Sequence, residues 1–196
     1  MLGPRLAVDL LCPGCGEERV LRPGECWLLC LGCRQASEAG GGGVLPLVWT
    51  RPFAGPSGPV IAFFRYASPR ITARDLAVET VLEPLTAGSP AWVLAMRVRG
   101  FTAFGDAGME YTRRPPRFDP GPPGEMPLAL TRGLGDAEAV LLSSLARRVA
   151  EAAPLSGATL TLEAGTPEIW CVTTQADGGH VKFPHTGIRV PLSSLS

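Results

Sequence analysis

Two cysteine pairs near the N-terminus of this 196-residue chain have the spacing of metal ligands. They are Cys12-Pro-Gly-Cys15 and Cys30-Leu-Gly-Cys33. A structural Zn²⁺ ion takes four ligands in a tetrahedron, with thiolate sulfurs about 2.3 Å from the metal. Two residues between cysteines allow a tight turn that directs both sulfurs to one ion. The doubled pattern therefore predicts a single four-thiolate site.

The residues around the pairs favour the turns that such a site needs. Gly14, Gly16 and Gly32 leave the backbone free to fold beside the thiols. Between the pairs, Arg22-Pro-Gly-Glu25 places Pro and Gly at the two central positions of a turn. We therefore expect a hairpin that brings the second cysteine pair back beside the first.

The stretch from about residue 5 to residue 36 resembles the zinc-ribbon family. Its first knuckle, Cys12-Pro-Gly-Cys15-Gly16, matches the family's Cys-Pro-x-Cys-Gly, whereas the second has Arg34 where Gly is common. The resemblance implies a small β-ribbon held by one structural zinc ion. Four thiolates complete the coordination shell of such an ion, and the metal substitutes for a core that about 35 residues cannot build alone.

Three alternatives use the same cysteines: a redox-active dithiol, a ribbon without metal, and a rubredoxin-like iron site. Cys26 precedes Cys30 by four residues and could replace a ligand, although a buried thiol near the site is the simpler interpretation. Trp27 then lies on the opposite face of its strand. It either packs in a small ribbon core or contacts a partner.

A run of glycines predicts how the chain is divided. Residues 39–43, Ala followed by four Gly, have the composition of a flexible tether. We expect a zinc ribbon over residues 1–38, a linker over 39–43 and an α+β domain over 44–196. The second domain is predicted to be mostly antiparallel β-sheet with one clear helix.

Hydrophobic patterns predict the elements of this second domain. Strands are expected at residues 44–50, 60–66, 91–99, 158–163, 168–175 and 180–183. Pro46 would place the first strand at a sheet edge or beside a bulge, and alternation makes residues 91–99 half-buried. Residues 73–84 are expected to form a helix or a strand, and residues 112–127, with six prolines, an extended loop. Asp136–Ala152 is the clear helix, with Asp136 as its cap.

The two histidines, His180 and His185, lie near Cys171 and Asp177 in the sequence, which makes a second metal site conceivable. The region has a β pattern without ligand spacing, so surface or turn histidines are the simpler interpretation. Cys171, between Trp and Val, is interpreted as a small buried hydrophobe and not as a nucleophile.

The proline-rich loop carries a small basic cluster, Arg113, Arg114 and Arg117, which could contact phosphate or an acidic partner. Asp119 and Glu125 dilute its charge, so solvated loop charge is the simpler interpretation. The sequence contains no phosphate-binding loop, nucleophile elbow or HExxH motif.

The charge balance bears on function. The chain has eighteen basic and eighteen acidic residues, so no strong positive field attracts nucleic acid.

We interpret the chain as a non-enzymatic adaptor or accessory subunit of a bacterial-type protein complex, with the ribbon as contact module and a protein as partner. Two alternatives remain. One is a nucleic-acid-binding or transcription-associated zinc-ribbon protein. The other is an enzyme with its site in residues 44–196, in a pocket lined by Arg97, Arg99, Asp106, Glu110 or the histidines.

The sequence predicts a cytoplasmic protein, because Asp9 interrupts the apolar stretch near the N-terminus and no signal peptide is expected. Thiols stay reduced in the cytoplasm, so the paired Cys-x-x-Cys motifs are expected to bind metal or perform redox chemistry and not to form disulfides. No apolar run reaches the roughly 20 residues that span a bilayer.

Overall fold

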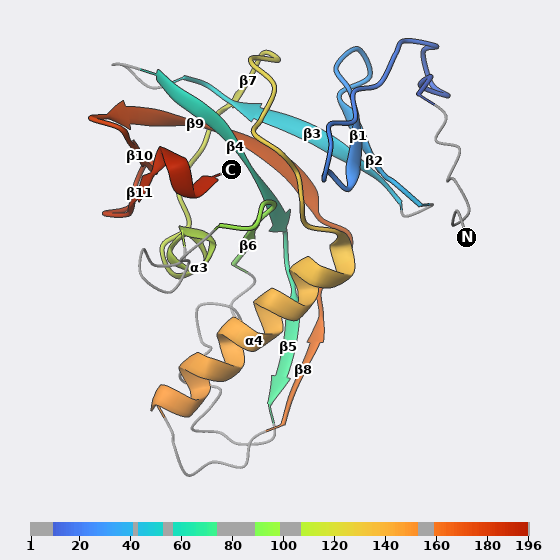
Figure 1. Cartoon of the computed structure of the whole chain (residues 1–196). Helices are drawn as coiled ribbons and strands as arrows, with labels where there is room; N and C mark the ends of the chain where they lie inside the picture. The colour runs from blue at the N-terminus through green and yellow to red at the C-terminus, as the bar shows by residue number, and fades with distance from the viewer. Residues whose placement is uncertain are drawn as a thin grey trace, which may run out of the picture.

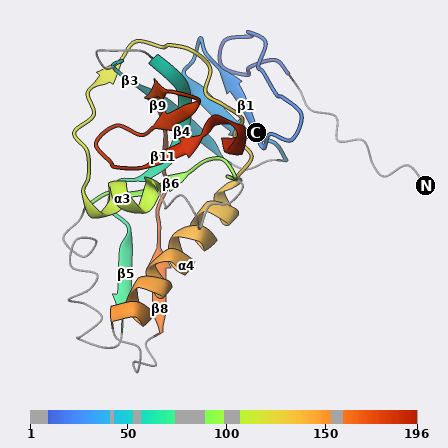
Figure 2. The ribbon, with the colours of Figure 1, turned by 60° about the vertical axis from the view of Figure 1, so that its left-hand side comes forward.

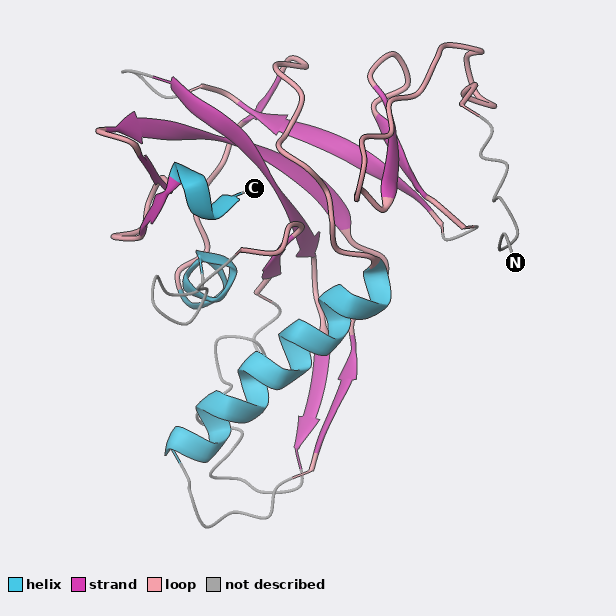
Figure 3. Cartoon of the chain, in the orientation of Figure 1, coloured by secondary structure: helices cyan, strands magenta, loops and turns pink. Residues whose placement is uncertain are grey.

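The computed structural model describes residues 10–40, 43–52, 57–73, 89–98, 107–152 and 159–195. Within them, a nine-stranded sheet forms the centre of the molecule, and a two-stranded ladder runs beside a long helix (Figures 1, 2 and 3). The large sheet contains β1 (Trp27–Cys30), β2 (Gln35–Glu38), β3 (Val44–Thr50), β4 (Ser57–Tyr66), β6 (Ala91–Leu94), β7 (Pro120–Gly121), β9 (Glu168–Asp177), β10 (His180–Lys182) and β11 (Arg189–Pro191). The ladder pairs β5 (Arg70–Ala73) with β8 (Leu160–Glu163). The helices are α3 (Ala107–Arg113), α4 (Leu134–Ala152) and the 3₁₀ turn η1 (Leu192–Leu195).

The strand order in the large sheet is β1-β2-β3-β9-β10-β11, and β4 pairs with both β9 and β6. The β3–β9 pair is parallel, whereas the other strand pairs of the described residues are antiparallel. The prediction of a mostly antiparallel α+β fold is confirmed. Two α-helices are described where the sequence predicted one.

Apolar side chains bury both faces of the sheet. Along β4, Phe64 packs in a first cluster with Leu141 and Leu145 of α4, and Phe63 packs in a second cluster with Tyr111 of α3. This arrangement corrects the expectation for residues 91–99. Trp92, Leu94 and Met96 do share one face, but Val93 and Ala95 on the opposite face are also buried, and the strand ends at Leu94.

The cysteine segment (residues 10–40) belongs to the same sheet. β2 pairs with β3 across the glycine run, with Ala36 opposite Leu45, and the amide of Glu38 donates to the carbonyl of Gly43 at 3.4 Å. Trp27, Leu29 and Ala36 lie in the first cluster together with the side chains of α4. The division into residues 1–38, 39–43 and 44–196 stays a prediction, but strands on either side of the glycines are neighbours in one sheet.

Helix α4 begins two residues before the predicted Asp136. The amide of Leu134 donates to Oε1 of Glu38 at 3.0 Å, so a carboxylate from β2 caps the helix. Asp136 lies in the first turn and pairs with Arg97 at 2.8 Å. Val140, Leu141, Leu145 and Val149 form an apolar stripe along α4 and pack in or against the first cluster, as the spacing of apolar residues in this segment indicates.

Several boundaries differ from expectation. The pairing of β3 with β9 begins at Leu47, directly after Pro46, so the missing N–H of this proline interrupts no bond of that ladder, and β3 is not an edge strand. The predicted helix or strand over 73–84 begins in β5 and otherwise lies outside the described residues. The proline-rich loop follows α3 and contributes the two-residue strand β7. No described helix is long and apolar enough to cross a membrane.

Candidate metal centre

The first knuckle folds back on itself immediately after Leu11. The amide of Cys12 donates to the carbonyl of Glu17, and the amide of Gly16 donates to the carbonyl of Cys12, both at 2.8 Å. Gly16 adopts a φ of 74°, a left-handed conformation that glycine takes without steric cost. The turn thereby places Cys12 and Cys15 on the same side of the backbone.

The second knuckle connects β1 to β2. Cys30 ends β1 opposite Gln35, and the amide of Cys33 donates to Sγ of Cys30 at 3.4 Å. Arg34 has a φ of 53°. It occupies the position after the last cysteine, as Gly16 does in the first knuckle. Both knuckles therefore use the same backbone handedness, although only one of them has the glycine that favours it.

The two knuckles bring four sulfur atoms together. All four Sγ atoms of Cys12, Cys15, Cys30 and Cys33 lie within 4.8 Å of one another, with 3.7 Å between Cys12 and Cys33 and 3.5 Å between Cys15 and Cys30. In a tetrahedron with metal–sulfur bonds of about 2.3 Å, the sulfurs are about 3.8 Å apart. The predicted set of cysteines is therefore assembled at metal-binding distance, and the spacing fits a zinc-sized ion.

The thiols of the cluster differ in acidity. Backbone N–H groups of Gly14 and Cys15 lower the pKa of Cys12 to about 7, whereas hydrogen bonds with the thiols of Cys15 and Cys12 raise the pKa of Cys33 to about 12. Burial raises the pKa of Cys30. A metal ion binds thiolates, so it must displace protons from the groups with raised pKa values. Metal affinity of such a cluster falls as the pH falls.

Cys26 and Trp27 lie beside the cluster without joining it. Cys26 is partly buried against the first core cluster and is not one of the four clustered thiols. Trp27 is completely buried, its Nε1 donates to the carbonyl of Arg132 at 2.9 Å, and its ring lies 5.6 Å from that of Phe64. The interpretation of Trp27 as an exposed partner contact is wrong, because this side chain docks the cysteine segment onto the main core.

The other predicted metal-ligand and thiol candidates do not join the cysteine cluster. Among the described residues, the four cysteines are the group of His, Cys, Asp and Glu side chains close enough to share a metal ion. Cys171 is buried in β9, and burial raises its pKa to about 12, which suppresses the thiolate. The imidazole of His180 lies 3.4 Å from the carbonyl of Gly178, and His185 packs against Phe118.

The charged residues that the sequence singled out do not form one group. Arg113 and Arg114 both pair with Glu110, and Arg97 pairs with Asp136. Arg117 instead lines a hollow with His185 and with Arg51, a residue that the sequence did not single out. Two further enzyme candidates, Arg99 and Asp106, lie outside the described residues.

No protein-family model, curated protein or solved structure matches this chain. Functional inference therefore rests on the sulfur cluster and on the surfaces around it. Two residues that the sequence did not single out have roles elsewhere in the fold: Glu38, which caps α4, and Arg51, which lines the hollow with Arg117. Neither has a local sequence signal, because each acts on a segment far away in the chain.

Proposed function

We propose that Cys12, Cys15, Cys30 and Cys33 bind one structural Zn²⁺ ion, and that the cysteine segment held by this ion is the contact module of a non-enzymatic adaptor or accessory subunit. Thiolates are soft ligands that suit zinc. Catalytic zinc keeps an open coordination position, whereas four cysteine ligands leave none. The ion would therefore support the fold and perform no chemistry.

The surroundings of the cluster suggest what the ion supports. Arg22 donates from its guanidinium to the carbonyl of Pro127 at 3.1 Å, the amide of Cys26 donates to the carbonyl of Leu130 at 2.8 Å, and Trp27 reaches Arg132. These bonds attach the cysteine segment to the stretch that leads into α4. A metal ion that fixes the two knuckles would hold β1 and β2 in position for these contacts.

The observation that carries the contact role is the distribution of exposed apolar side chains. Among the described residues, six large apolar side chains are exposed, and five of them lie between residues 10 and 44: Leu10, Leu11, Val20, Leu31 and Val44. Three of the five, Leu10, Leu11 and Leu31, lie within two residues of a clustered cysteine. Exposed apolar side chains that gather on a surface are typical of protein-binding sites, and here they are concentrated along the sequence beside the clustered cysteines.

Charge favours a protein partner over nucleic acid. Among the described residues of the cysteine segment, the basic side chains are those of Arg19, Arg22 and Arg34, and they are offset by Glu17, Glu18, Glu25 and Glu38. A surface that contacts phosphates needs an excess of positive charge. Nucleic-acid binding is therefore the weaker alternative for this segment.

A pull-down with matched surface variants tests the contact role. Leu11→Glu and Leu31→Glu place a charge beside the cluster, and Leu192→Glu places the same charge at η1, where Leu192 is also exposed. We expect the full chain and Leu192→Glu to retain a nuclease-resistant, stoichiometric protein partner that both cluster variants lose. A partner retained by all variants, or lost by all three, would contradict the proposal. Zinc content of each variant checks that the cluster is intact.

A further inference from the structure

Two hollows meet at the C-terminal end of β3, where the proline-rich loop runs alongside the strand. β7 pairs with β3, with Thr50 opposite Pro120, and the amide of Arg51 donates to the carbonyl of Asp119 at 3.0 Å. A Cβ atom at Gly121 would lie 3.1 Å from the amide nitrogen of Arg51, so glycine permits this close approach. The loop is thus held against the strand and forms a wall for both hollows.

The two hollows differ in chemistry. The apolar hollow, of about 260 Å³, is lined by the apolar side chains of Trp49, Val60, Pro52, Pro122 and Pro123, by Glu125, and by the hydroxyl-bearing residues Thr50, Ser57 and Thr173. The cationic hollow, of about 370 Å³, is lined by Thr50, Arg51, Pro52, Arg117, Phe118, Asp119 and His185. Thr50 and Pro52 line both, so the hollows adjoin. The cationic hollow lies at the lower end of the range of roughly 300–1,000 Å³ for ligand sites, and the apolar hollow lies just below that range.

The cationic hollow favours an anion with a single charge. Two arginines, Arg51 and Arg117, and one acidic residue, Asp119, line it. In the described part of the chain, neither arginine has a carboxylate within the 4.0 Å of an ion pair. Nε of Arg51 donates to the carbonyl of Pro120 at 3.4 Å, which holds that side chain along the loop. The formal charge of these three groups is +1, which suits a carboxylate better than a doubly charged phosphate.

We propose that the two hollows together bind one small organic carboxylate, with its head group at Arg51 and Arg117 and its apolar tail against Trp49 and the loop prolines. Guanidinium groups bind carboxylates through paired N–H donors. The apolar hollow supplies the area that a short hydrocarbon tail removes from water. This binding site is separate from the metal role of the cysteines, and its test does not depend on that role.

Titration of the full chain with sodium hexanoate at constant ionic strength tests the site. Calorimetry measures the affinity, and intrinsic tryptophan fluorescence, to which Trp49 contributes as one of four tryptophans, follows binding in parallel. We expect saturable binding with a Kd on the order of 1 mM. Butanoate should bind more weakly, by about fourfold for each methylene removed. Hexan-1-ol, acetate and inorganic phosphate should bind far more weakly than hexanoate.

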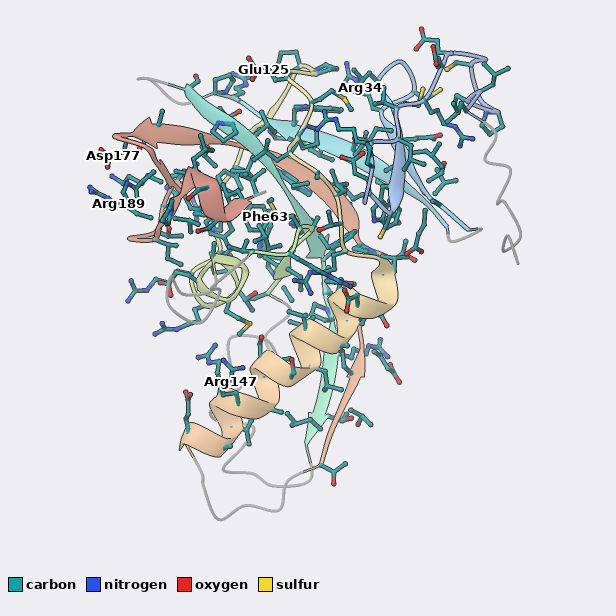
Figure 4. The ribbon with its side chains drawn as sticks, viewed as in Figure 1. Arg34, Phe63, Glu125, Arg147, Asp177 and Arg189 are labelled. Atoms are coloured by element: carbon teal, nitrogen blue, oxygen red, sulfur yellow. The ribbon has the colours of Figure 1, made fainter. Side chains whose placement is uncertain are left out.

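Two matched variants test whether the positive charge of Arg117 binds the carboxylate head group. Arg117→Gln should weaken hexanoate binding at least about tenfold, because a charge-assisted contact to the head group is lost. Arg147→Gln is the control, since Arg147 is exposed on α4, well away from Glu125 of the loop (Figure 4). The proposal is overturned if hexanoate shows no saturable binding, if hexan-1-ol or phosphate binds as tightly as hexanoate, or if both variants lose affinity equally.

Discussion

The two ends of the large sheet hold their turns in different ways. At the C-terminal end, the loop between β10 and β11 is fixed by packing: Phe183 is buried against Phe63, and the hydroxyl of Tyr111 donates to the carbonyl of Pro184 at 2.9 Å. At the other end, the two knuckles of the cysteine segment surround four sulfur atoms, and Leu11 and Leu31 beside them are exposed.

The difference shows how a sheet end can be stabilised with few apolar residues. The C-terminal loop contributes side chains to a large aromatic cluster and needs no ligand. The knuckles contribute thiols instead, and under the proposed function a metal ion supplies the cohesion that packing supplies elsewhere. Their apolar side chains then remain at the surface and available to a partner. Trp27 and Glu38 connect the cysteine segment to the packed core, because each bonds a residue of the main fold.

Loss of one cysteine thiol should have the largest effect, and it should affect the cysteine segment alone. Cys33→Ser removes a ligand, and structural zinc in small domains contributes on the order of 10 kcal/mol to folding. We expect the variant to lose its metal and residues 10–24 to lose amide protection in hydrogen exchange, while β3, β4 and β9 remain protected. Cys26→Ser is the control, because Cys26 is not part of the sulfur cluster. Equal protection of residues 10–24 in both variants would contradict the account.

Trp27→Ala tests whether the cysteine segment is energetically part of the main fold. The substitution empties a fully buried site and removes the hydrogen bond to Arg132. We expect the free energy of unfolding of the whole chain to fall by about 3–5 kcal/mol. Leu192→Ala, at an exposed site, should change it by less than about 0.5 kcal/mol. If denaturation of residues 44–195 is unchanged in Trp27→Ala, the segment is an independent domain.

The cap on α4 should have a smaller effect. Glu38→Ala removes the acceptor for the amide of Leu134, so the free energy of unfolding should fall by about 1 kcal/mol. Glu138→Ala removes an exposed carboxylate from the same helix without removing a cap and should be nearly neutral. Chemical denaturation measures both, and an equal effect of the two substitutions would show that the cap contributes nothing.

Arg34→Gly should give the smallest change, and one of opposite sign. Arg34 has a φ of 53°, which is costly for a residue with a side chain and free for glycine. We expect the variant to be more stable by about 0.5 kcal/mol after the greater freedom of glycine in the unfolded chain is subtracted. Arg147→Gly, inside α4, should instead be less stable by about 1 kcal/mol. A loss of stability in both variants would show that Arg34 has a contact outweighing its backbone cost.

Features that depend on the spacing of residues within one segment were predictable from the sequence, whereas contacts between distant segments were not. The four cysteines, the strands from Val44 and Val60 and the stripe on α4 each follow from spacing within one segment. The docking of Trp27 and the cap from Glu38 depend on residues about a hundred positions away, which no local pattern encodes. The cationic hollow is similar, because Arg51, Arg117 and His185 come from three separate segments.

Two local expectations failed for physical reasons. Residues 91–96 alternate as a half-buried strand does, yet both faces are covered, because α3 packs on one face and α4 on the other. Helix α3 was not predicted, and its seven residues are held mainly by tertiary contacts. Tyr111 is buried in the second cluster, and the hydroxyl of Thr112 donates to the carbonyl of Gly108.

The most direct test of the account is the metal content of the full chain, purified without chelator under reducing conditions and measured by atomic emission. The account predicts one zinc ion per chain, retained after exhaustive dialysis and absent from Cys33→Ser. It also predicts that zinc protects Cys12, Cys15, Cys30 and Cys33 from alkylation, whereas Cys26 reacts alike with and without zinc. A full chain that takes up no zinc on reconstitution, and whose four clustered thiols alkylate freely, would contradict the central claim.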